Sequence, residues 1–395
     1  MKPLEIDVLV VGAGAAGMMC AGEAGRRGRS VLVVDHARAP GEKIRISGGG
    51  RCNFTNLGCG PHAFLGENPR FATSALKRFT QHDFLKRVEA AGIAWHEKTL
   101  GQLFCDDSAK QIVRMLTDGM AAAGATLRTG TGVDRVERRG EGFEAALSDG
   151  SVVRARSLVL ATGGKSIPKM GATGWAYDAA RRFGLRVTET RPGLVPLTFE
   201  AGLLETLAPL AGLSVEAVVR HGRTSFAEGL LFTHRGLSGP SILQISSYWR
   251  EGEAITVALA PGVDVLAALK AAKAANGKQA VHTALGHITP RRLAESLCAR
   301  EGVHGRLAEV GDAALRRLDE AVNRWTVKPV GSEGYRTAEV TLGGVATDQL
   351  DQQTMQAKSV PGLYVIGEAV DVTGWLGGYN FQWAWSSGWA AGQVC

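Results

Sequence analysis

A glycine-rich segment near the N-terminus has the residue types and spacing that bind a dinucleotide. Gly12, Gly14 and Gly17 form a Gly-x-Gly-x-x-Gly pattern directly after the apolar run at residues 8–11. In this pattern the first glycine makes a tight turn, the second lets the backbone approach a pyrophosphate, and the third lets the following helix pack on the strand. The N-terminus of that helix then offers N–H groups and the positive end of its dipole to the phosphates.

An acidic residue follows at the distance that this arrangement uses for a ribose. Residues 30–34 read Ser-Val-Leu-Val-Val, which predicts a second buried strand, and Asp35 comes directly after it. The carboxylate of Asp35 can accept hydrogen bonds from a ribose, and its charge disfavours a 2′-phosphate. Because NAD and FAD both use this arrangement, the segment alone leaves both dinucleotides open.

Two further glycine-rich segments are expected to lie against the same ligand. Residues 47–53 read Ser-Gly-Gly-Gly-Arg-Cys-Asn, and we interpret them as backbone placed against a ligand rather than as a flexible surface loop. Residues 377–382 read Gly-Gly-Tyr-Asn-Phe-Gln and open a predicted final helix that runs through Ala391. This helix gives a second N-terminus for negative charge. A dinucleotide held by both ends of the chain fits FAD, which is bound extended, better than NAD.

The composition is that of a globular protein with an unusual share of glycine. The chain has 395 residues, of which 45% are hydrophobic and 21% charged, with a formal net charge of +7; these values exclude a mainly disordered chain. Glycine accounts for 52 of the 395 residues, well above the usual share of about 7%. There is no membrane-spanning stretch, no signal-peptide pattern and no CxxC or metal-ligand spacing among the cysteines. We therefore expect a cytoplasmic protein with reduced thiols, no metal and no membrane partner.

The N-terminal part of the chain is expected to continue as an α/β domain. Apolar residues at helical spacing predict helices over residues 71–92 and 108–124. Alternating residues predict a β-meander over residues 131–155. A buried strand at 157–161 then runs into Thr162-Gly163-Gly164, whose small side chains permit close approach to a cofactor.

From about residue 190 to 335 no nucleotide-binding pattern recurs, which indicates an inserted unit with a β part and a helical part. The strands predicted there cover residues 194–199, 214–220 and 254–259, and the helices cover 263–275, 290–300 and 312–325. The α/β pattern then returns with a strand at 362–368 that ends in Gly367-Glu368, followed by Asp371.

Three segments spread over the chain carry a resemblance to a known family. Residues 45–53 contain Ser-Gly-Gly-Gly-Arg-Cys-Asn, residues 231–240 read Leu-Phe-Thr-His-Arg-Gly-Leu-Ser-Gly-Pro, and residues 367–382 end in Gly-Gly-Tyr-Asn-Phe-Gln. In combination they resemble the flavoprotein family that includes aminoacetone oxidases and the BaiN-type and YhiN-like NAD(P)/FAD-dependent oxidoreductases. The resemblance implies an α/β fold: a Rossmann-like FAD-binding domain of the two-part GR2 type with an inserted β-barrel-like domain and a small helical domain. The implied boundaries are 1–189 and 335–395 for the FAD-binding domain, 190–260 and 322–334 for the β-barrel-like domain, and 261–321 for the helical domain.

The resemblance also implies where non-covalently bound FAD lies. Its ADP half is expected near the first glycine loop, Asp35 and Thr162. Its ribityl–pyrophosphate part is expected near Glu368 and Asp371, and its isoalloxazine near residues 378–381, where a positive helix end would stabilise the anionic reduced flavin. The predicted cofactor-binding residues are Gly12, Gly14, Ala15, Ala16, Gly17, Asp35, His36, Lys43, Ser47, Gly48, Gly49, Arg51, Cys52, Asn53, Val133, Thr162, Gly163, Gly164, Gly367, Glu368, Asp371, Gly378, Tyr379, Asn380 and Phe381.

The predicted reaction is a two-electron transfer through flavin N5 on a small organic substrate. The other redox partner is NAD(P)H, bound transiently because no second dinucleotide pattern is present, or oxygen. The candidates for proton transfer or substrate contact are His234, Arg235 and Tyr379. A turn-capping role for His234 is equally open. Cys52 and Cys59 are open as a redox pair, although a lone cysteine is more often an inert small hydrophobe.

Three other functions remain open from the sequence. An RNA-modifying or RNA-binding flavoprotein is permitted by the net charge of +7, but no Lys/Arg cluster supports it, so a nucleic-acid partner is not expected. The other two are a regulatory FAD-binding protein without turnover and an enone reductase similar to fumarate reductases. The substrate is left open, and the protein is expected to be a monomer or a homodimer.

Overall fold

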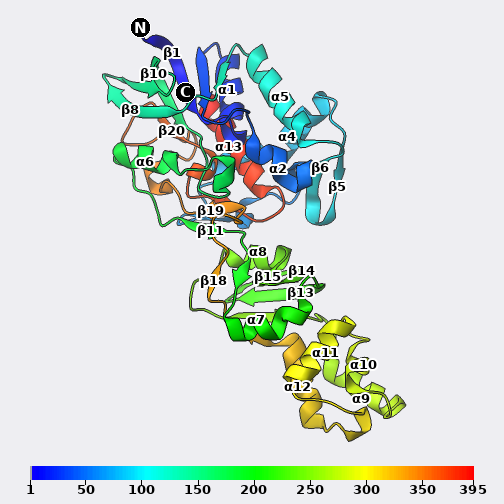
Figure 1. Ribbon diagram of the computed structural model, residues 1–395. Coiled ribbons are helices and arrows are strands. Elements are labelled where there is room, and N and C mark those ends of the chain that lie inside the picture. The colour runs from blue at the N-terminus through cyan, green and yellow to red at the C-terminus, as the bar shows by residue number, and fades with distance from the viewer. Residues whose placement is uncertain (1) are drawn as a thin grey trace. The chain divides into compact units, whose positions relative to one another are not determined.

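The computed structural model describes residues 2–395, which form two compact units (Figure 1). Unit 1 contains the chain up to Arg191 together with Val340–Cys395, and unit 2 is Pro192–Glu339. Unit 2 is therefore one continuous insertion between two parts of unit 1. Among residues 2–395, no helix combines the length and the low polarity that crossing a lipid bilayer requires.

The core of unit 1 is a seven-stranded sheet whose central strands are parallel. β1 (Leu4–Val11) lies between β2 (Val31–Asp35) and β10 (Val152–Leu160). β7 (Thr126–Thr129) extends the sheet beyond β2, and β20 (Leu363–Val365) pairs with β10. The apolar runs of β1 and β2 are buried on both faces, as the sequence predicts for parallel strands covered on both sides.

The predicted β-meander is confirmed, with one difference. It consists of β8 (Val133–Arg139), β9 (Gly142–Leu147) and the first half of β10, and β9 is antiparallel to both neighbours. The two strands expected at 152–155 and 157–161 are one continuous strand. This is because the first half of β10 pairs with β9, the second half pairs with β20, and β1 supports the other edge along both halves.

Two helices from opposite ends of the chain lie side by side in unit 1 (Figure 1). α1 (Ala15–Arg26) follows the first glycine loop, and α13 (Tyr379–Gly392) is the predicted final helix. A Cβ added at Gly388 would overlap the carbonyl oxygen of Ala16, so the two helix backbones are in direct contact. This contact brings the N-terminal and C-terminal parts of the predicted site together.

The helix expected over residues 71–92 is two helices, α3 (Thr73–Arg78) and α4 (Gln81–Ala90). The Asp83 carboxylate accepts a hydrogen bond from the Thr80 N–H at 2.9 Å, and the Asp83 N–H donates to the Thr80 hydroxyl at 3.3 Å. This reciprocal capping box satisfies N–H groups that a continuous helix would bond internally. The chain therefore begins a new helix at Thr80 instead of continuing the first.

Several short elements complete unit 1. They are α2 (Glu42–Gly50), β3 (Asn53–Asn56), β4 (Phe64–Leu65), β5 (Trp95–Glu97), β6 (Gln102–Cys105), α5 (Ala109–Ala122), α6 (Trp175–Arg182), β19 (Val340–Leu342) and β21 (Thr373–Gly374). β11 (Arg191–Gly193) lies where the chain passes from unit 1 into unit 2. α5 begins after Ser108, whose hydroxyl accepts from the Lys110 N–H at 3.2 Å and so caps the helix.

Unit 2 consists of an antiparallel sheet and a helical part. The strand order is β17-β16-β13-β14-β15-β12-β18. The strands are β12 (Leu197–Thr198), β13 (Ser214–His221), β14 (Thr224–Thr233), β15 (Gly236–Ser238), β16 (Ile255–Ala258), β17 (Trp325–Val327) and β18 (Gly331–Ser332). The ten-residue strand β14 is absent from the prediction, because Glu228 and Gly229 interrupt its apolar alternation.

The helices of unit 2 are α7 (Ala201–Leu207), α8 (Pro240–Ser246), α9 (Val265–Ala275), α10 (Val281–Leu285), α11 (Arg291–Arg300) and α12 (Asp312–Asn323). The three helices that the sequence predicts in unit 2 are present as α9, α11 and α12, and the short helix α10 lies between the first two of them. α10 has only five residues, too few for a helical period to show in the sequence.

Replacing Gly388 by Ala is expected to destabilise the protein by about 1–3 kcal/mol, because α1 and α13 would have to separate around the new methyl group. Gly22→Ala is the matched control, because a Cβ at this α1 position meets its nearest neighbour at 3.9 Å. That variant is expected to keep its stability or gain up to about 1 kcal/mol of helix propensity. Urea unfolding measures both variants, and equal effects would contradict the proposed backbone contact.

Candidate functional site

The loop between β1 and α1 has the geometry that close contact with a ligand requires. Gly12 has a φ of 111°, and a Cβ there would lie 2.5 Å from the carbonyl oxygen of Ala161. A Cβ at Gly17 would overlap the carbonyl oxygen of Gly12. At Gly14, by contrast, no heavy atom of the described chain outside residues 13–15 lies within 4 Å of the Cβ position. Folding therefore requires glycine at positions 12 and 17, while Gly14 leaves open space at the N-terminus of α1.

Asp35 lies at the end of β2 and orders this loop. Its Oδ2 accepts a hydrogen bond from the Ala13 N–H at 2.7 Å, and its Oδ1 accepts one from the Ala37 N–H at 2.8 Å. Each carboxylate oxygen keeps a second lone pair, so Asp35 can still accept hydrogen bonds from a ribose. The predicted residue His36 lies beside it, with Nδ1 3.6 Å from Asp35 Oδ1, and its ring packs against Gly171.

The end of β10 brings a hydroxyl to the same place. The Cα of Thr162 lies 2.9 Å from the Cβ position of Gly12, so the two loops are in contact. The Thr162 Oγ1 is buried and has no hydrogen-bond partner among the described residues 2–395. Because buried hydroxyls are nearly always hydrogen-bonded, this one fits a polar group of a bound molecule. The neighbouring Gly163 has a φ of 73°, which glycine adopts without strain.

A carboxylate with a full set of partners joins four segments around the site. Glu368 accepts hydrogen bonds from Lys43 Nζ at 2.6 Å, the Ser166 hydroxyl at 3.0 Å and the Thr341 N–H at 2.9 Å. Burial raises the pKa of Glu368, but the Lys43 ammonium and these hydrogen bonds outweigh burial and hold the pKa below its ordinary value. A Cβ at Gly164 would lie 2.7 Å from the Glu368 Oε1. The predicted residues Lys43, Gly164 and Glu368 thus meet in a network that positions the surrounding loops.

The glycines of residues 47–53 lie at the C-terminal end of α2, where the backbone leaves the helical conformation. α2 is regular up to Ile46; Ser47 is then extended, and Gly48 and Gly49 have φ values of 57° and 67°. Gly48 packs against the ring of Phe104, at 2.7 Å from its Cβ position. Gly49 is exposed, and apart from residues 48–50 and the backbone of α2 itself, no heavy atom of the described chain lies within 4 Å of its Cβ position. The exposed backbone at Gly49 is therefore open to a ligand, which was the basis of the prediction.

Cys52 and Cys59 do not have the properties of a redox pair. Cys52 is fully buried with a φ of 55°, and burial raises the pKa of its thiol far above the ordinary value. Burial also raises the pKa of the Cys59 thiol to about 12. Both thiols are therefore protonated near neutral pH, whereas thiol–disulfide exchange requires a thiolate. Cys52 turns the chain from α2 into β3, and the preceding Arg51 is exposed.

The N-terminus of α13 faces the segment that follows α2. Gly378, with a φ of 96°, precedes the helix, and a Cβ there would overlap the carbonyl oxygen of Thr55. The Asn380 side chain holds the turn, since it accepts from the Gly374 N–H at 2.8 Å and donates to the Gly374 carbonyl at 2.9 Å. Because the N-cap residue is Gly378, the helix has no side-chain cap from that position. Its positive dipole end is therefore available to a negative group.

Two aromatic residues, Tyr379 and Phe381, lie in the first turn of α13, on the predicted flavin side of the site. Tyr379 is 8% exposed and packs edge-on against Phe64 and Trp375, with ring centroids 6.3 and 6.1 Å away. Phe381 stacks on Trp385 at 5.7 Å. These contacts give both rings a positioning role, and a catalytic role for Tyr379 stays a prediction.

The other predicted cofactor residues lie close to these loops. Gly367 follows β20, and its Cβ position is 2.9 Å from the Ala16 Cβ at the start of α1. Asp371 is 3% exposed, and its carboxylate accepts from the Glu67 N–H at 2.9 Å; burial raises its pKa. Val133 is buried at the start of β8.

His234 and Arg235, the two candidates for proton transfer, belong to unit 2. They form the turn between β14 and β15, and both are exposed. The Arg235 N–H donates to the Thr233 hydroxyl at 3.2 Å, so the turn is ordered locally. The predicted cofactor residues and Tyr379, by contrast, all belong to unit 1.

Several polar residues of the site were missed by the sequence prediction. Ser166 and Thr341 bond Glu368, as described above. The Asn56 side chain donates to the Gly377 carbonyl at 2.9 Å, and the Gln102 and Asn53 amides hydrogen-bond at 2.9 Å. One sequence signal could have indicated the Asn56 and Gln102 contacts. The short strand β3 has an asparagine at each end, and β6 begins with a glutamine.

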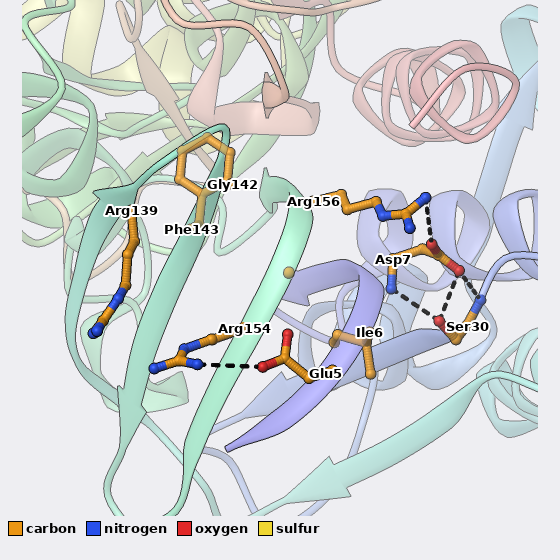
Figure 2. Close-up of a pocket in the computed structure, with 10 residues that line it drawn as sticks. Glu5, Ile6, Asp7, Ser30, Arg139, Gly142, Phe143, Arg154 and Arg156 are labelled. Carbon is orange, nitrogen blue, oxygen red and sulfur yellow. Dashed lines mark hydrogen bonds and ion pairs between the residues drawn. The ribbon is translucent and has the colours of Figure 1, made fainter. Parts of the chain in front are cut away.

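A separate hollow of about 500 Å³ lies at the other end of β1 (Figure 2). Figure 2 shows Glu5 directed at Arg154, and Asp7 directed at Ser30 and Arg156. The Glu5–Arg154 and Asp7–Arg156 ion pairs measure 3.4 and 3.6 Å. Because these charges are already paired, and because parallel sheets bind ligands at the carboxyl ends of their strands, this hollow is not the cofactor site.

Comparisons with known proteins agree with this geometry. The family model described as the HI0933-like protein Rossmann domain matches residues 6–394. The chain belongs to this family. A ribosomal RNA dihydrouridine synthase of Escherichia coli (strain K12) is 51% identical over 98% of both chains. The protein of the same name from Haemophilus influenzae is 44% identical over 97% of this chain and 96% of the relative.

More distant relatives share the fold. A 3-dehydro-bile acid delta(4,6)-reductase of Clostridium scindens is 28% identical over 98% of both chains. The solved structure of a 3-ketosteroid-delta4-(5alpha)-dehydrogenase from Rhodococcus jostii RHA1 matches with a TM-score of 0.51 at 15% identity, over 99% of this chain and 98% of that one. The latter likeness concerns the fold alone.

These findings confirm the predicted FAD cofactor, the Rossmann-type FAD-binding fold and the enzyme class. The protein is a FAD-dependent oxidoreductase. The resemblance to aminoacetone oxidases in particular finds no support in these matches. Which residues contact FAD stays a prediction; it is supported by the open backbone at Gly14 and Gly49 and by the unpartnered Thr162 hydroxyl.

Gly14→Val is expected to abolish FAD binding without unfolding the protein. The new side chain would occupy the open space at the N-terminus of α1, where the pyrophosphate is predicted. The loss of a glycine cap costs at most about 1 kcal/mol. The flavin absorbance per protein measures FAD binding, and the melting temperature of the FAD-free form shows whether the protein is still folded. A variant that keeps full FAD content would contradict the predicted position of the pyrophosphate.

Lys43→Met is expected to destabilise the protein by about 1–3 kcal/mol at pH 7, because it leaves the Glu368 carboxylate without its cation. In the wild type the pKa of Glu368 is lowered, so its stabilisation is present above the unfolded-state value of about 4.3 and is lost as pH falls. Without Lys43, burial raises this pKa and protonation becomes favourable.

The stability difference between wild type and Lys43→Met should therefore narrow as pH falls from 7 to 5. Urea unfolding at several pH values measures it, and Lys169→Met, at an exposed lysine, is the control expected to show no such trend. A difference that stays constant with pH would mean that Lys43 does not act through a carboxylate.

Proposed function

We propose that this protein is a ribosomal RNA dihydrouridine synthase, which reduces the C5=C6 double bond of a uridine with NAD(P)H as the electron donor. The observation that carries this proposal is the identity of 51% and 44%, over nearly the whole of both chains, with two relatives of that name. The bile acid reductase, at 28% identity over the same span, is markedly more distant.

The two named activities share one kind of chemistry. The C5=C6 bond of uracil is conjugated with the C4 carbonyl, and a delta-4 double bond is conjugated with a 3-oxo group in the same way. In each case a hydride adds to the carbon β to the carbonyl and a proton adds to the α carbon. For uridine the balance is uridine + NAD(P)H + H⁺ → dihydrouridine + NAD(P)⁺. When bound, FAD supplies the two-electron carrier between donor and substrate.

The residues of this chain would provide position, charge and a proton. The uncapped N-terminus of α13 would stabilise negative charge on the reduced cofactor. Addition to C6 places negative charge on the C4 oxygen, which a guanidinium stabilises, and C5 then needs an acid. The residues that the sequence offers for these two tasks are Arg235 and His234, which are both exposed in the turn between β14 and β15.

An RNA substrate differs from the partner that the sequence predicts. The absence of a Lys/Arg run argued against nucleic acid. A single-stranded target read at one base, however, is recognised by stacking on that base and by hydrogen bonds to its edges. Such a site is compatible with the modest net charge of +7.

A second candidate function is reduction of a small free enone. It is favoured by the bile acid reductase, which this chain matches over 98% of both lengths. The same residues would act in the same way on such a substrate, so the two candidates differ in the substrate and not in the chemistry. The following experiment therefore includes both.

The purified protein, incubated without oxygen with NAD(P)H and ribosomal RNA from cells that lack its gene, is expected to form dihydrouridine. Mass spectrometry of the digested RNA measures the gain of two hydrogens on uridine. The Gly14→Val variant, expected to lack FAD, is the control. If the RNA is unchanged while a 3-oxo-delta-4 steroid is reduced, the second candidate replaces the first.

Arg235→Ala and His234→Ala are each expected to lower the rate of uridine reduction by about 10²–10⁴-fold at unchanged FAD content. Arg223→Ala is the matched control, because Arg223 is an exposed arginine in the turn at the opposite end of β14. Single-turnover rates with ribosomal RNA measure these effects. Equal rates of uridine reduction in the Arg223→Ala and Arg235→Ala variants would show that Arg235 has no role in the reaction.

A further inference from the structure

An exposed leucine with a left-handed backbone forms the tip of the β5–β6 hairpin. Leu100 is 64% exposed and has φ 60° and ψ 32°. Residues other than glycine, asparagine and aspartate rarely adopt this conformation. An exposed apolar side chain on a strained backbone contributes nothing to folding. Such features persist where the surrounding structure imposes them, and they are frequent at functional sites.

The backbone of Leu100 is tied to the turn that begins α13. The Asn56 side-chain amide donates to the Leu100 carbonyl at 3.0 Å and to the Gly377 carbonyl at 2.9 Å. The next residue, Gly101, accepts a hydrogen bond from the Leu57 N–H at 2.8 Å. A single buried amide therefore fixes the hairpin tip against the predicted flavin side of the site.

The strand after the tip makes a second connection to the same place. The Lys98 N–H donates to the Gln102 carbonyl at 2.8 Å and closes the hairpin. The Gln102 side chain hydrogen-bonds the amide of Asn53 at 2.9 Å and packs against Gly377, at 3.0 Å from its Cβ position. Leu100 is thus held rigidly beside the two glycine segments that are predicted to contact the flavin.

Cationic and aromatic side chains lie on the strands of the same hairpin and on the segment beside it. The Lys98 ammonium is exposed and lies 5.5 Å from the Phe104 ring, on which His96 stacks at 5.9 Å. The exposed Arg51 lies on the neighbouring segment, whose carbonyl accepts from the Cys105 N–H at 3.0 Å. The hairpin and its neighbouring segment thus offer an apolar tip and, further along, exposed cations, which suits a nucleotide with its apolar base face and anionic phosphate.

We propose that Leu100 contacts the face of a nucleobase adjacent to the target uridine and holds the uridine out of the RNA stack. This inference rests on the proposed function, since only a base within a polynucleotide has to leave a stack before a reaction can reach it. Apolar side chains inserted between bases are a known means of unstacking them. The rigid attachment of the tip to the flavin side fixes the distance between the unstacked base and the site of the reaction.

Leu100→Asn tests this role, because asparagine tolerates the left-handed conformation and removes the apolar contact. The variant is expected to keep or raise the melting temperature. It is expected to lower kcat/KM for ribosomal RNA about tenfold, mainly through KM. FAD content and the rate at which NAD(P)H bleaches the bound flavin should not change. Leu4→Asn, at a 41% exposed leucine of unit 1, is the matched control and should leave all these quantities unchanged.

The outcomes separate this inference from the proposed function. If the wild type forms dihydrouridine and Leu100→Asn forms it with unchanged kcat/KM, the inference is wrong and the proposed function stands. A loss of FAD, or slower bleaching by NAD(P)H, would place Leu100 against the cofactor and also overturn the inference. If the wild type forms no dihydrouridine in ribosomal RNA, the proposed function fails and the inference falls with it.

Discussion

The site depends on backbone segments that touch without side chains between them. Gly12 lies against Ala161, Gly17 against the carbonyl of Gly12, and Gly388 against the carbonyl of Ala16. These contacts fix the N-terminus of α1 between the end of β10 and helix α13. A methyl group at any of them would push apart elements that are distant in sequence. The glycine content of the chain is in this sense a requirement of the site, since a dinucleotide needs the same closeness to the backbone.

The electrostatics of these backbone segments favour a negatively charged ligand. The N-termini of α1 and α13 both begin after a glycine, Gly14 and Gly378, which provides no side-chain cap. They are suited to the negative charges at the two ends of an extended dinucleotide, the pyrophosphate and the reduced flavin. The one carboxylate with a lowered pKa beside them, Glu368, is neutralised by Lys43. It therefore orders the loops without adding an unpaired negative charge to a site for an anionic ligand.

Much of the fold was predictable because its signals are local. The Gly12–Gly17 pattern, the apolar strands and the Gly377-Gly378 turn each lie within a few residues, and the structure has them where the sequence places them. The sequence prediction failed where contacts between residues far apart in the chain determine the structure. β10 is one strand because β9 and β20 pair with its two halves, and the partners of Glu368 include Lys43, 325 residues away. The free Thr162 hydroxyl and the Asn56 bridge are of this second kind, since each depends on which segments fold against each other.

The composition argued against a nucleic-acid partner, and under the proposed function this has a physical explanation. Net charge and basic runs report on proteins that contact many phosphates, and this chain has a modest net charge of +7 and no basic run. An enzyme that modifies a single base needs instead a means to present that base and a cofactor beside it. The hairpin tip at Leu100 has the properties of such a device: it is apolar, exposed and strained, and it is fixed by Asn56 to the turn that begins α13. Under the proposed function, the observation that bears on an RNA substrate is therefore the exposed apolar side chain of Leu100 on this fixed hairpin tip, rather than the net charge of the chain.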